Sequence, residues 1–287
     1  KGIESLKESF EVIYNPATTR KPNLYLIGIG VSEYTNSAFN LKYPVKDITD
    51  IVTAFKANSQ MFGEVKVMQL TDKDVTIQNI LALKQNLVNT DVSDYVLAFW
   101  AGHGLLSNDM EYYLATYNVD FNKPEINGIN YSMLETIFEG IPARRKALFI
   151  DACHSGEVDK EGTQLIASSE TSQGTVKSRG FMSVKPKEKS LGLKNSFDLM
   201  QELFSDVQRG NGANIISAAG GAEFALESDT WHNGVFTYSI LSGLKDNAAD
   251  MDGDGQIMLS ELQKYLQKQV FTLTKGQQKP TSRVENL

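Results

Sequence analysis

The chain has 287 residues, of which 41% are hydrophobic, and it carries a formal net charge of −7. This length and apolar content are enough for one large α/β domain, with or without appendages. The negative charge and the dispersed Lys and Arg residues argue against binding to nucleic acid. A single cysteine excludes an intrachain disulfide, and no segment approaches the roughly 20 consecutive apolar residues that span a membrane.

The N-terminal part is expected to be an appendage, with a short amphipathic helix over residues 1–14 and a linker that ends at residue 22. It shows no signal-peptide pattern. We therefore expect a soluble protein without a membrane partner, and the cytoplasm is the favoured location. Because the chain begins at Lys1 rather than Met, it is interpreted as a processed form or an excised domain.

Segments with strand and helix character alternate over residues 23–287. Strands are expected at 24–30, 64–70, 95–101, 146–152 and 213–219, and helices at 45–57, 76–88, 131–139, 197–208, 235–244 and 261–271. The run 24–30 is apolar throughout, which is typical of a central parallel strand covered on both faces. The alternation predicts an α/β fold in which helices flank both faces of a mostly parallel sheet.

Cys153 and His103 are the candidate catalytic residues, because each closely follows one of the expected strands. In open α/β sheets, catalytic groups lie outside the carboxyl ends of the strands. An imidazole close to a thiol promotes formation of the nucleophilic thiolate. Two alternatives are a buried cysteine with an unrelated loop histidine, and a zinc site completed by His154, for which the chain lacks paired ligand spacing.

The motifs around these two residues resemble those of the caspase-like cysteine peptidases, most closely the bacterial metacaspase-like enzymes. The resemblance spans most of the chain and is carried by Gly102-His-Gly104, Asp151-Ala-Cys-His-Ser-Gly156, Leu24-Tyr-Leu-Ile-Gly-Ile-Gly30, Asn40-Leu-Lys-Tyr43 with Asp47, Tyr112-Tyr-Leu-Ala115 and Gly234-Val-Phe-Thr-Tyr238. It implies a caspase-like three-layer sandwich over residues 23–287. A large-subunit-like part (23–156), a linker (157–195) and a small-subunit-like part (196–287) are expected.

The resemblance implies a cysteine endopeptidase in which His103 takes the thiol proton of Cys153 and the thiolate attacks the scissile carbonyl. The backbone N–H groups of Gly104 and Cys153 are the expected oxyanion hole. This chemistry needs no cofactor. The expected partners of the protein are protein or peptide substrates, and the resemblance to metacaspases favours a monomer. The alternative is a catalytically silent interaction or calcium-sensing domain, against which the presence of both dyad residues argues.

Acidic residues favour a substrate with a basic P1 side chain. Asp151 replaces the glutamine of aspartate-specific caspases, and three acidic residues but no basic one lie between Ser217 and Thr230: Glu223, Glu227 and Asp229. A buried charge needs an opposite charge, and by resemblance to metacaspases Asp47 and Asp151 bind the cation of P1 Arg or Lys. Two alternatives are that Asp47 complements a helix dipole from its first turn, and that Asp151 forms hydrogen bonds with the nucleophile loop. Ala101 stands where metacaspases commonly have Ser, so the choice between Arg and Lys stays open.

The segment 157–195 is too long and too polar for an ordinary connection. In caspase-like enzymes the corresponding linker joins the two catalytic subunits and is often cut during maturation. Its basic residues are candidate sites for self-cleavage, including Lys160, Lys177, Arg179, Lys185, Lys187 and Lys189. Self-processing is therefore expected if the enzyme cleaves after basic residues.

The segment 250–261 matches the loop of an EF-hand, with Asp at positions 1, 3 and 5, Gly at position 6 and Glu at position 12. The candidate calcium ligands are Asp250, Asp252, Asp254, Gln256 and Glu261. Since a second hand is missing, the alternative is a turn and helix cap that binds no metal.

Overall fold

The computed structural model describes residues 20–109, 111–152, 169–171, 174–178, 213–218 and 225–283. Four expectations fall wholly or largely outside these residues. They are the helix at 1–14, the helix at 197–208, most of the linker 157–195, and the nucleophile Cys153.

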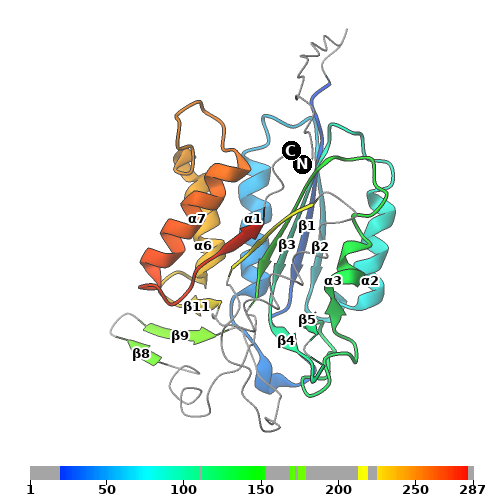
Figure 1. The fold of residues 1–287 in the computed structure, drawn as a ribbon, viewed down its shortest axis with the longest axis vertical. Helices are drawn as coiled ribbons and strands as arrows, with labels where there is room; N and C mark the ends of the chain where they lie inside the picture. The colour runs from blue at the N-terminus through cyan, green and yellow to red at the C-terminus, as the bar shows by residue number, and fades with distance from the viewer. Residues whose placement is uncertain are drawn as a thin grey trace, which may run out of the picture.

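A six-stranded sheet forms the centre of the fold, in the order β13-β10-β7-β3-β1-β2 (Figure 1). Its strands are β1 Leu24–Gly30, β2 Val65–Thr71, β3 Tyr95–Ala101, β7 Arg145–Asp151, β10 Ala213–Ser217 and β13 Thr281–Arg283. All neighbouring strands are parallel except β10 and β13, which are antiparallel. The five expected strands are confirmed to within two residues at each end, and β13 adds an antiparallel edge that was not predicted.

Helices cover both faces of this sheet and complete the three-layer sandwich (Figure 1). One face carries α1 Pro44–Ala57, α6 Val235–Leu244 and α7 Leu259–Leu273, and the other carries α2 Ile77–Ala82 and α3 Tyr131–Glu135. Among the described residues, short 3₁₀ helices lie between the longer elements: η1 Ser37–Phe39, η2 Asp72–Asp74, η3 Leu83–Asn86 and η5 Lys245–Asn247. No helix in the described ranges is both long and apolar enough to cross a bilayer.

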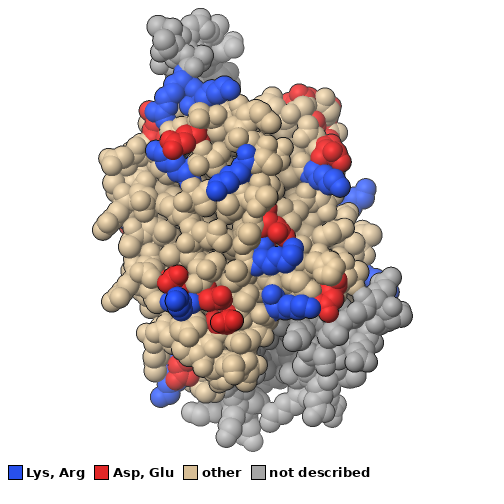
Figure 2. All heavy atoms as spheres, turned by 180° about the vertical axis from the view of Figure 1, so that it is seen from behind, with Lys and Arg blue, Asp and Glu red and all other residues tan. Residues whose placement is uncertain are grey.

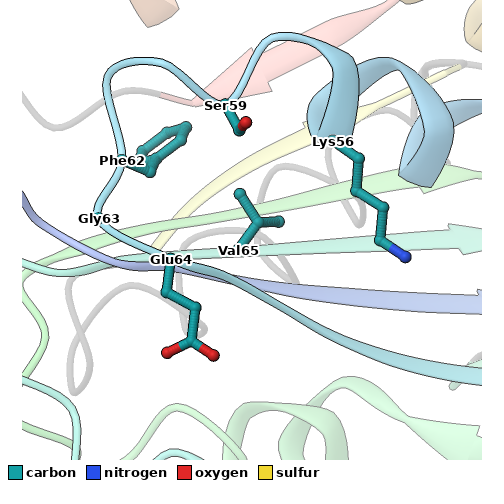
Figure 3. Close-up of a pocket in the computed structure, with 6 residues that line it drawn as sticks. All are labelled: Lys56, Ser59, Phe62, Gly63, Glu64 and Val65. Atoms are coloured by element: carbon teal, nitrogen blue, oxygen red, sulfur yellow. The ribbon is translucent and has the colours of Figure 1, made fainter.

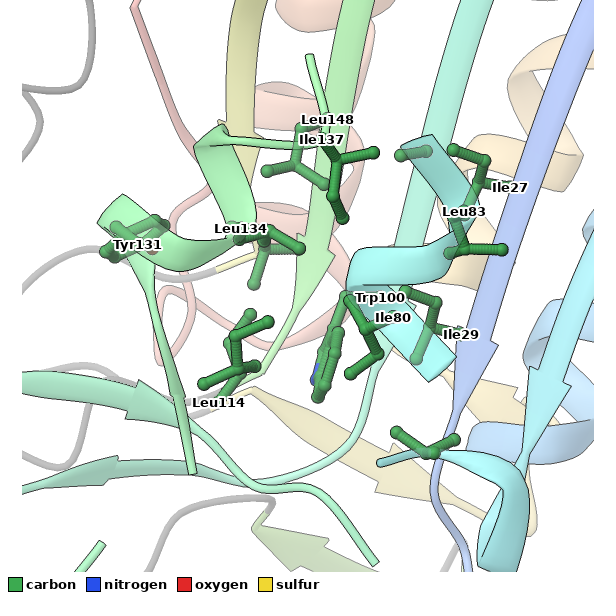
Figure 4. Packing of buried hydrophobic residues seen from close by; sticks show 14 of the residues in the cluster. Ile27, Ile29, Ile80, Leu83, Trp100, Leu114, Tyr131, Leu134, Ile137 and Leu148 are labelled. Atoms are coloured by element: carbon green, nitrogen blue, oxygen red, sulfur yellow. The ribbon is translucent and has the colours of Figure 1, made fainter. Parts of the chain in front are cut away.

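The alternation of side chains along β1 divides the core into two clusters, one on each face of the sheet. Leu24 and Leu26 belong to the cluster under α1, α6 and α7. The cluster under α2 and α3 brings together residues from both helices and from the strands, as Figure 4 shows for Ile27, Ile29, Ile80, Leu83, Trp100, Leu134 and Leu148. Burial on both faces explains why the run 24–30 is apolar throughout.

Two helices on the second face are shorter than expected. The predicted helix 76–88 is α2 followed by the 3₁₀ turn η3. The predicted helix 131–139 ends as α3 at Glu135, because the N–H groups of Ile137 and Phe138 bond carbonyls three residues earlier. Such bonds tighten the last turn of a helix.

Two small sheets lie beyond the central one, and neither was predicted. The first contains β4 Gly104–Leu106, β5 Tyr112–Leu114 and β6 Ile129–Asn130. The second contains β8 Ser169–Thr171, β9 Gly174–Ser178, β11 Leu226–Ser228 and β12 Asn233–Gly234, in the order β12-β11-β9-β8. Strands of two to five residues are too short to show a period in the sequence.

Glycine allows α1 to pack closely against β1. A Cβ atom on Gly28 would lie 2.4 Å from Cγ2 of Ile48, and one on Gly30 would lie 2.8 Å from the carbonyl oxygen of Pro44. The first turn of α1 therefore lies against the carboxyl end of β1. Asp47 is in that first turn, so the close packing brings its carboxylate to the edge of the sheet where the candidate site lies.

Candidate active site

The parallel strands end together at one edge of the sheet, and the residues of the expected dyad follow two neighbouring strands there. Ala101 at the end of β3 pairs with Asp151 at the end of β7, and the N–H of Gly102 donates to the carbonyl of Asp151 at 3.2 Å. His103 is two residues beyond Ala101, and Cys153 is two residues beyond Asp151. The described residues thus include one member of the dyad and the strand end that leads to the other.

His103 is 5% exposed, and its imidazole is anchored by a backbone carbonyl. Nε2 lies 2.8 Å from the carbonyl oxygen of Phe39. Because a carbonyl only accepts hydrogen bonds, Nε2 carries the proton in this contact. In the neutral ring, Nδ1 is then the basic nitrogen. This is the tautomer that a general base needs if Nδ1 faces the thiol.

The contact of Phe39 with His103 could not be found from the sequence, because the atom involved is a backbone oxygen that any residue carries. Phe39 ends η1, within the connection between β1 and α1. The side chain of Asn40 accepts the N–H of Tyr34 at 2.9 Å, and the N–H of Leu41 donates to Ser32 at 2.9 Å. These bonds close the connection into a defined loop. The motif Asn40-Leu-Lys-Tyr43 was the only indication in the sequence that this connection is part of the site.

Asp47 is fully buried, and its carboxylate binds the start of α6. It accepts the side-chain amide of Asn233 at 2.8 Å and the N–H of Gly234 at 3.1 Å. Gly234 is the N-cap of α6 and has no side chain that could accept a first-turn N–H. The carboxylate therefore supplies an acceptor and a negative charge at a helix N-terminus, where both are stabilising.

Asp151 is 3% exposed and binds the same helix terminus. One oxygen of its carboxylate accepts the hydroxyl of Thr237 at 2.9 Å and the N–H of Thr237 at 3.3 Å. The structure thus brings Asp47 and Asp151, the two predicted substrate-binding residues, to the first turn of α6. Asp47 itself lies in the first turn of α1, and its carboxylate also places negative charge at the start of α6.

A lysine from outside the segment between Ser217 and Thr230 lies beside the acidic residues near β11. The ammonium of Lys42 lies 2.6 Å from Asp229, which also accepts the hydroxyl of Tyr43. These hydrogen bonds from Lys42 and Tyr43 lower the pKa of Asp229 below its ordinary value. The backbone N–H of Lys42 donates to the buried carboxylate of Glu227 at 3.0 Å. Glu223 lies outside the described residues.

Gly104, the predicted oxyanion-hole residue next to His103, is buried and begins β4. It pairs with Leu114 across the β4–β5 hairpin. The carbonyl of His103 accepts the N–H of Ala115 at 2.9 Å. The hairpin therefore fixes the backbone of Gly104 directly after the histidine. A fixed backbone N–H is what a preorganised oxyanion hole requires.

Three of the candidate calcium ligands lie together. The carboxylates of Asp250, Asp252 and Asp254 each offer an oxygen within 4.8 Å of the others. Glu261 is outside this group. Its carboxylate instead accepts backbone N–H groups of the loop, at 2.8 Å from Met251 and 2.8 Å from Met258, and these bonds lower its pKa. Three clustered carboxylates fit the oxygen ligands that calcium prefers.

The EF-hand-like loop 250–261 and the candidate active site lie at opposite ends of α6. The helix begins at the residues that bind Asp47 and Asp151 and runs for 10 residues, or about 15 Å. The loop follows at the far end, before α7 (Figure 1). A cation bound there is therefore too distant to touch the reacting atoms.

A separate cavity of about 140 Å³ lies near the end of α1 and the start of β2 (Figure 3). It is lined by Lys56, Ser59, Phe62, Gly63, Glu64 and Val65. None of these is a predicted site residue. β2 starts here, so the cavity is at the edge of the sheet opposite to the carboxyl ends of the strands.

Comparisons with known proteins support this assignment of fold and family. The crystal structure of protein GSU0716 from Geobacter sulfurreducens is similar, with a TM-score of 0.58 and 15% identity over 91% of this chain and 93% of that one. At this identity the similarity concerns the fold alone. No curated protein sequence matches the chain. The family model described as the caspase domain matches residues 26–287. The chain therefore belongs to the caspase domain family of cysteine peptidases.

Proposed function

We propose that the chain is a cysteine endopeptidase in which His103 and Cys153 form the catalytic dyad. The anchored imidazole of His103 is the observation that carries this proposal. Its Nε2 is held by the Phe39 carbonyl at 2.8 Å, which makes Nδ1 the basic nitrogen of the neutral ring and the proposed proton acceptor of the thiol. The paired ends of β3 and β7 support it further, because neighbouring parallel strands run about 4.8 Å apart.

The proposed reaction has two stages. Nδ1 of His103 takes the proton of the Cys153 thiol, and the thiolate attacks the scissile carbonyl to form a tetrahedral oxyanion. The N–H groups of Gly104 and Cys153 stabilise the oxyanion. The imidazolium returns the proton to the leaving amine, which leaves an acyl-enzyme thioester. Water, deprotonated by the same imidazole, then releases the acid and restores the thiol.

A basic P1 residue fits the charges around α6. Asp47 on α1 and Asp151 on β7 both bind the start of α6. A carboxylate has about four lone-pair sites, so each can accept further hydrogen bonds from a substrate. The guanidinium of Arg or the ammonium of Lys would bring a positive charge to these carboxylates. Fluorogenic peptides with Arg, Lys or Asp at P1, assayed with and without calcium, test the function. Failure to cleave any of them would contradict it.

The linker is the proposed substrate of self-processing. Its strand β9 pairs with β11, and Lys177 lies opposite Glu227 in that register, so a basic linker residue lies beside the acidic region. We expect wild-type protein to separate into two fragments on a denaturing gel, and Cys153→Ala to stay intact. Because β7 and β10 pair across the linker, the fragments should co-elute under native conditions. Equal cutting of the Cys153→Ala protein would refute self-processing.

Protein substrates rather than nucleic acid are the proposed partners. Figure 2 shows one face of the molecule, on which Lys and Arg lie singly or beside Asp and Glu. Such mixing provides no stripe of positive charge for a phosphate backbone. It agrees with the formal net charge of −7.

We also propose that the segment 250–261 binds calcium through Asp250, Asp252 and Asp254, together with the backbone carbonyl of Gln256 and, after a change of side-chain conformation, Glu261. The ion is expected to stabilise the α6–α7 pair rather than take part in catalysis. At a concentration 100 times Kd, calcium should raise Tm by about 5 °C. Thermal unfolding measures this without any substrate.

The calcium prediction has a matched control. Asp252→Asn should abolish the rise in Tm, since it removes a charged ligand from the group. Asp246→Asn should retain it, because Asp246 lies in η5 outside the loop, and Asn tolerates its positive φ of 53°. A Tm of the wild type that does not change with calcium would show that the loop is only a turn and helix cap.

A further inference from the structure

We propose that Tyr34 is a positioning residue for His103, which it holds through both its hydroxyl and its ring. The inference deepens the proposed peptidase function and rests on it. Tyr34 lies in the connection after β1 and is buried. It contacts the proposed general base and has no part in the reaction steps described above.

The hydroxyl of Tyr34 fixes the backbone of the histidine. It accepts the backbone N–H of His103 at 3.0 Å. This donor is one residue beyond Gly102, whose N–H donates to the end of β7. Leaving a buried N–H without an acceptor destabilises the folded state. The backbone of His103 is therefore favoured in the position where its N–H reaches the Tyr34 hydroxyl.

The ring of Tyr34 restricts the imidazole. The two ring centroids lie 5.3 Å apart at an interplanar angle of 42°. Phe121 packs edge-on against both rings, at 5.2 Å from Tyr34 and 5.6 Å from His103. Since Phe39 of the same connection binds Nε2, one segment holds the histidine by its backbone, its ring and its ring nitrogen.

Two residues of the sequence motifs now have a physical explanation. A Cβ atom on Gly102 would lie 3.1 Å from the Tyr34 hydroxyl and 3.4 Å from Nε1 of Trp100. The absence of a side chain at this position therefore lets the hydroxyl reach the backbone. Asn40 fixes the other end of the contact, because its side chain accepts the N–H of Tyr34 at 2.9 Å.

Tyr34→Phe tests the hydroxyl while keeping the ring. Tyr113→Phe is the matched control, because Tyr113 is also buried but its hydroxyl donates to Glu111. For a peptide with P1 Arg, we expect Tyr34→Phe to lower kcat by about 10-fold with KM changed less than about two-fold. The midpoint of the pH dependence of Cys153 alkylation by iodoacetamide should rise by about one pH unit, toward that of an ordinary thiol. Tyr113→Phe should match the wild type in both measurements.

Alkylation needs no peptide turnover, so it separates this inference from the peptidase proposal. If the wild type cleaves no peptide, the proposed function fails, whereas the alkylation curves still decide the role of Tyr34. The shift should vanish in a His103→Ala background, because Tyr34 acts through that histidine. An unshifted curve for Tyr34→Phe, an equal shift for Tyr113→Phe, or a shift that persists without His103 would each overturn the inference.

Discussion

His103→Ala is expected to lower kcat/KM for a peptide with P1 Arg by about 1,000-fold or more. The imidazole is buried and held by the Phe39 carbonyl, so another side chain cannot easily take its place. In the proposed mechanism, the Cys153 thiol would then lose its proton acceptor and the leaving amine would lose its proton donor. Steady-state kinetics should show the loss in kcat with a much smaller change in KM, because the imidazole acts on the reacting atoms rather than on substrate side chains.

The matched control for this loss is His232→Asn. His232 is exposed in the turn between β11 and β12, with a positive φ of 52° that Asn accepts. Its N–H donates to the carbonyl of Ser228, and the substitution keeps that backbone bond. Activity close to that of the wild type is expected. If His103→Ala were as active as His232→Asn, His103 would not be the general base.

Asp47→Asn and Asp151→Asn should each reduce kcat/KM for P1 Arg and Lys peptides by about 100-fold, through the loss of a charged contact worth several kcal/mol. The amide keeps an oxygen that can accept the N–H groups at the start of α6, so the helix terminus should stay in place. The negative charge is lost. Cleavage after an uncharged P1 residue should change far less, and the ratio of the two rates measures the effect on specificity.

Asp50→Asn is the control for charge alone. Asp50 lies one turn beyond Asp47 on α1, and its carboxylate also accepts the side chain of Asn233, at 2.9 Å. It is bound in addition by Lys46, so its charge is already neutralised in part. A preference for P1 Arg near that of the wild type is expected. If the preference survived in Asp47→Asn and Asp151→Asn as well, these carboxylates would serve only to hold α6.

Much of the fold could be predicted because the central strands carry a local signal. Residues 24–30 and 95–101 were placed without error, since burial on both faces requires an apolar side chain or glycine at nearly every position. The helix over 235–244 was likewise confirmed. The short strands β4, β11 and β12 were missed. They pair with segments that are distant in the chain or joined by tight turns, and their lengths are too small for a periodic pattern.

The candidate site was predictable where chemistry depends on residue type. The thiol and the imidazole follow strands, one carboxylate ends a strand and the other lies in the first turn of a helix, and their identities are visible in the chain. The bond from His103 to Phe39 spans 64 positions and that from Lys42 to Glu227 spans 185. Such contacts depend on how the elements pack, and one partner is often a backbone atom without any sequence signature.

The sequence by itself determined the family motifs, the mostly parallel sheet and the candidates for nucleophile, base and cation ligands, because these depend on local periodicity and on side-chain chemistry. Only the tertiary structure decided that Asp47 and Asp151 meet at the start of α6, that Lys42 lies beside Asp229, and that one loop holds His103. Those outcomes depend on where packed elements bring distant atoms within hydrogen-bonding distance. Distances between atoms that are far apart in the chain cannot be read from the sequence directly.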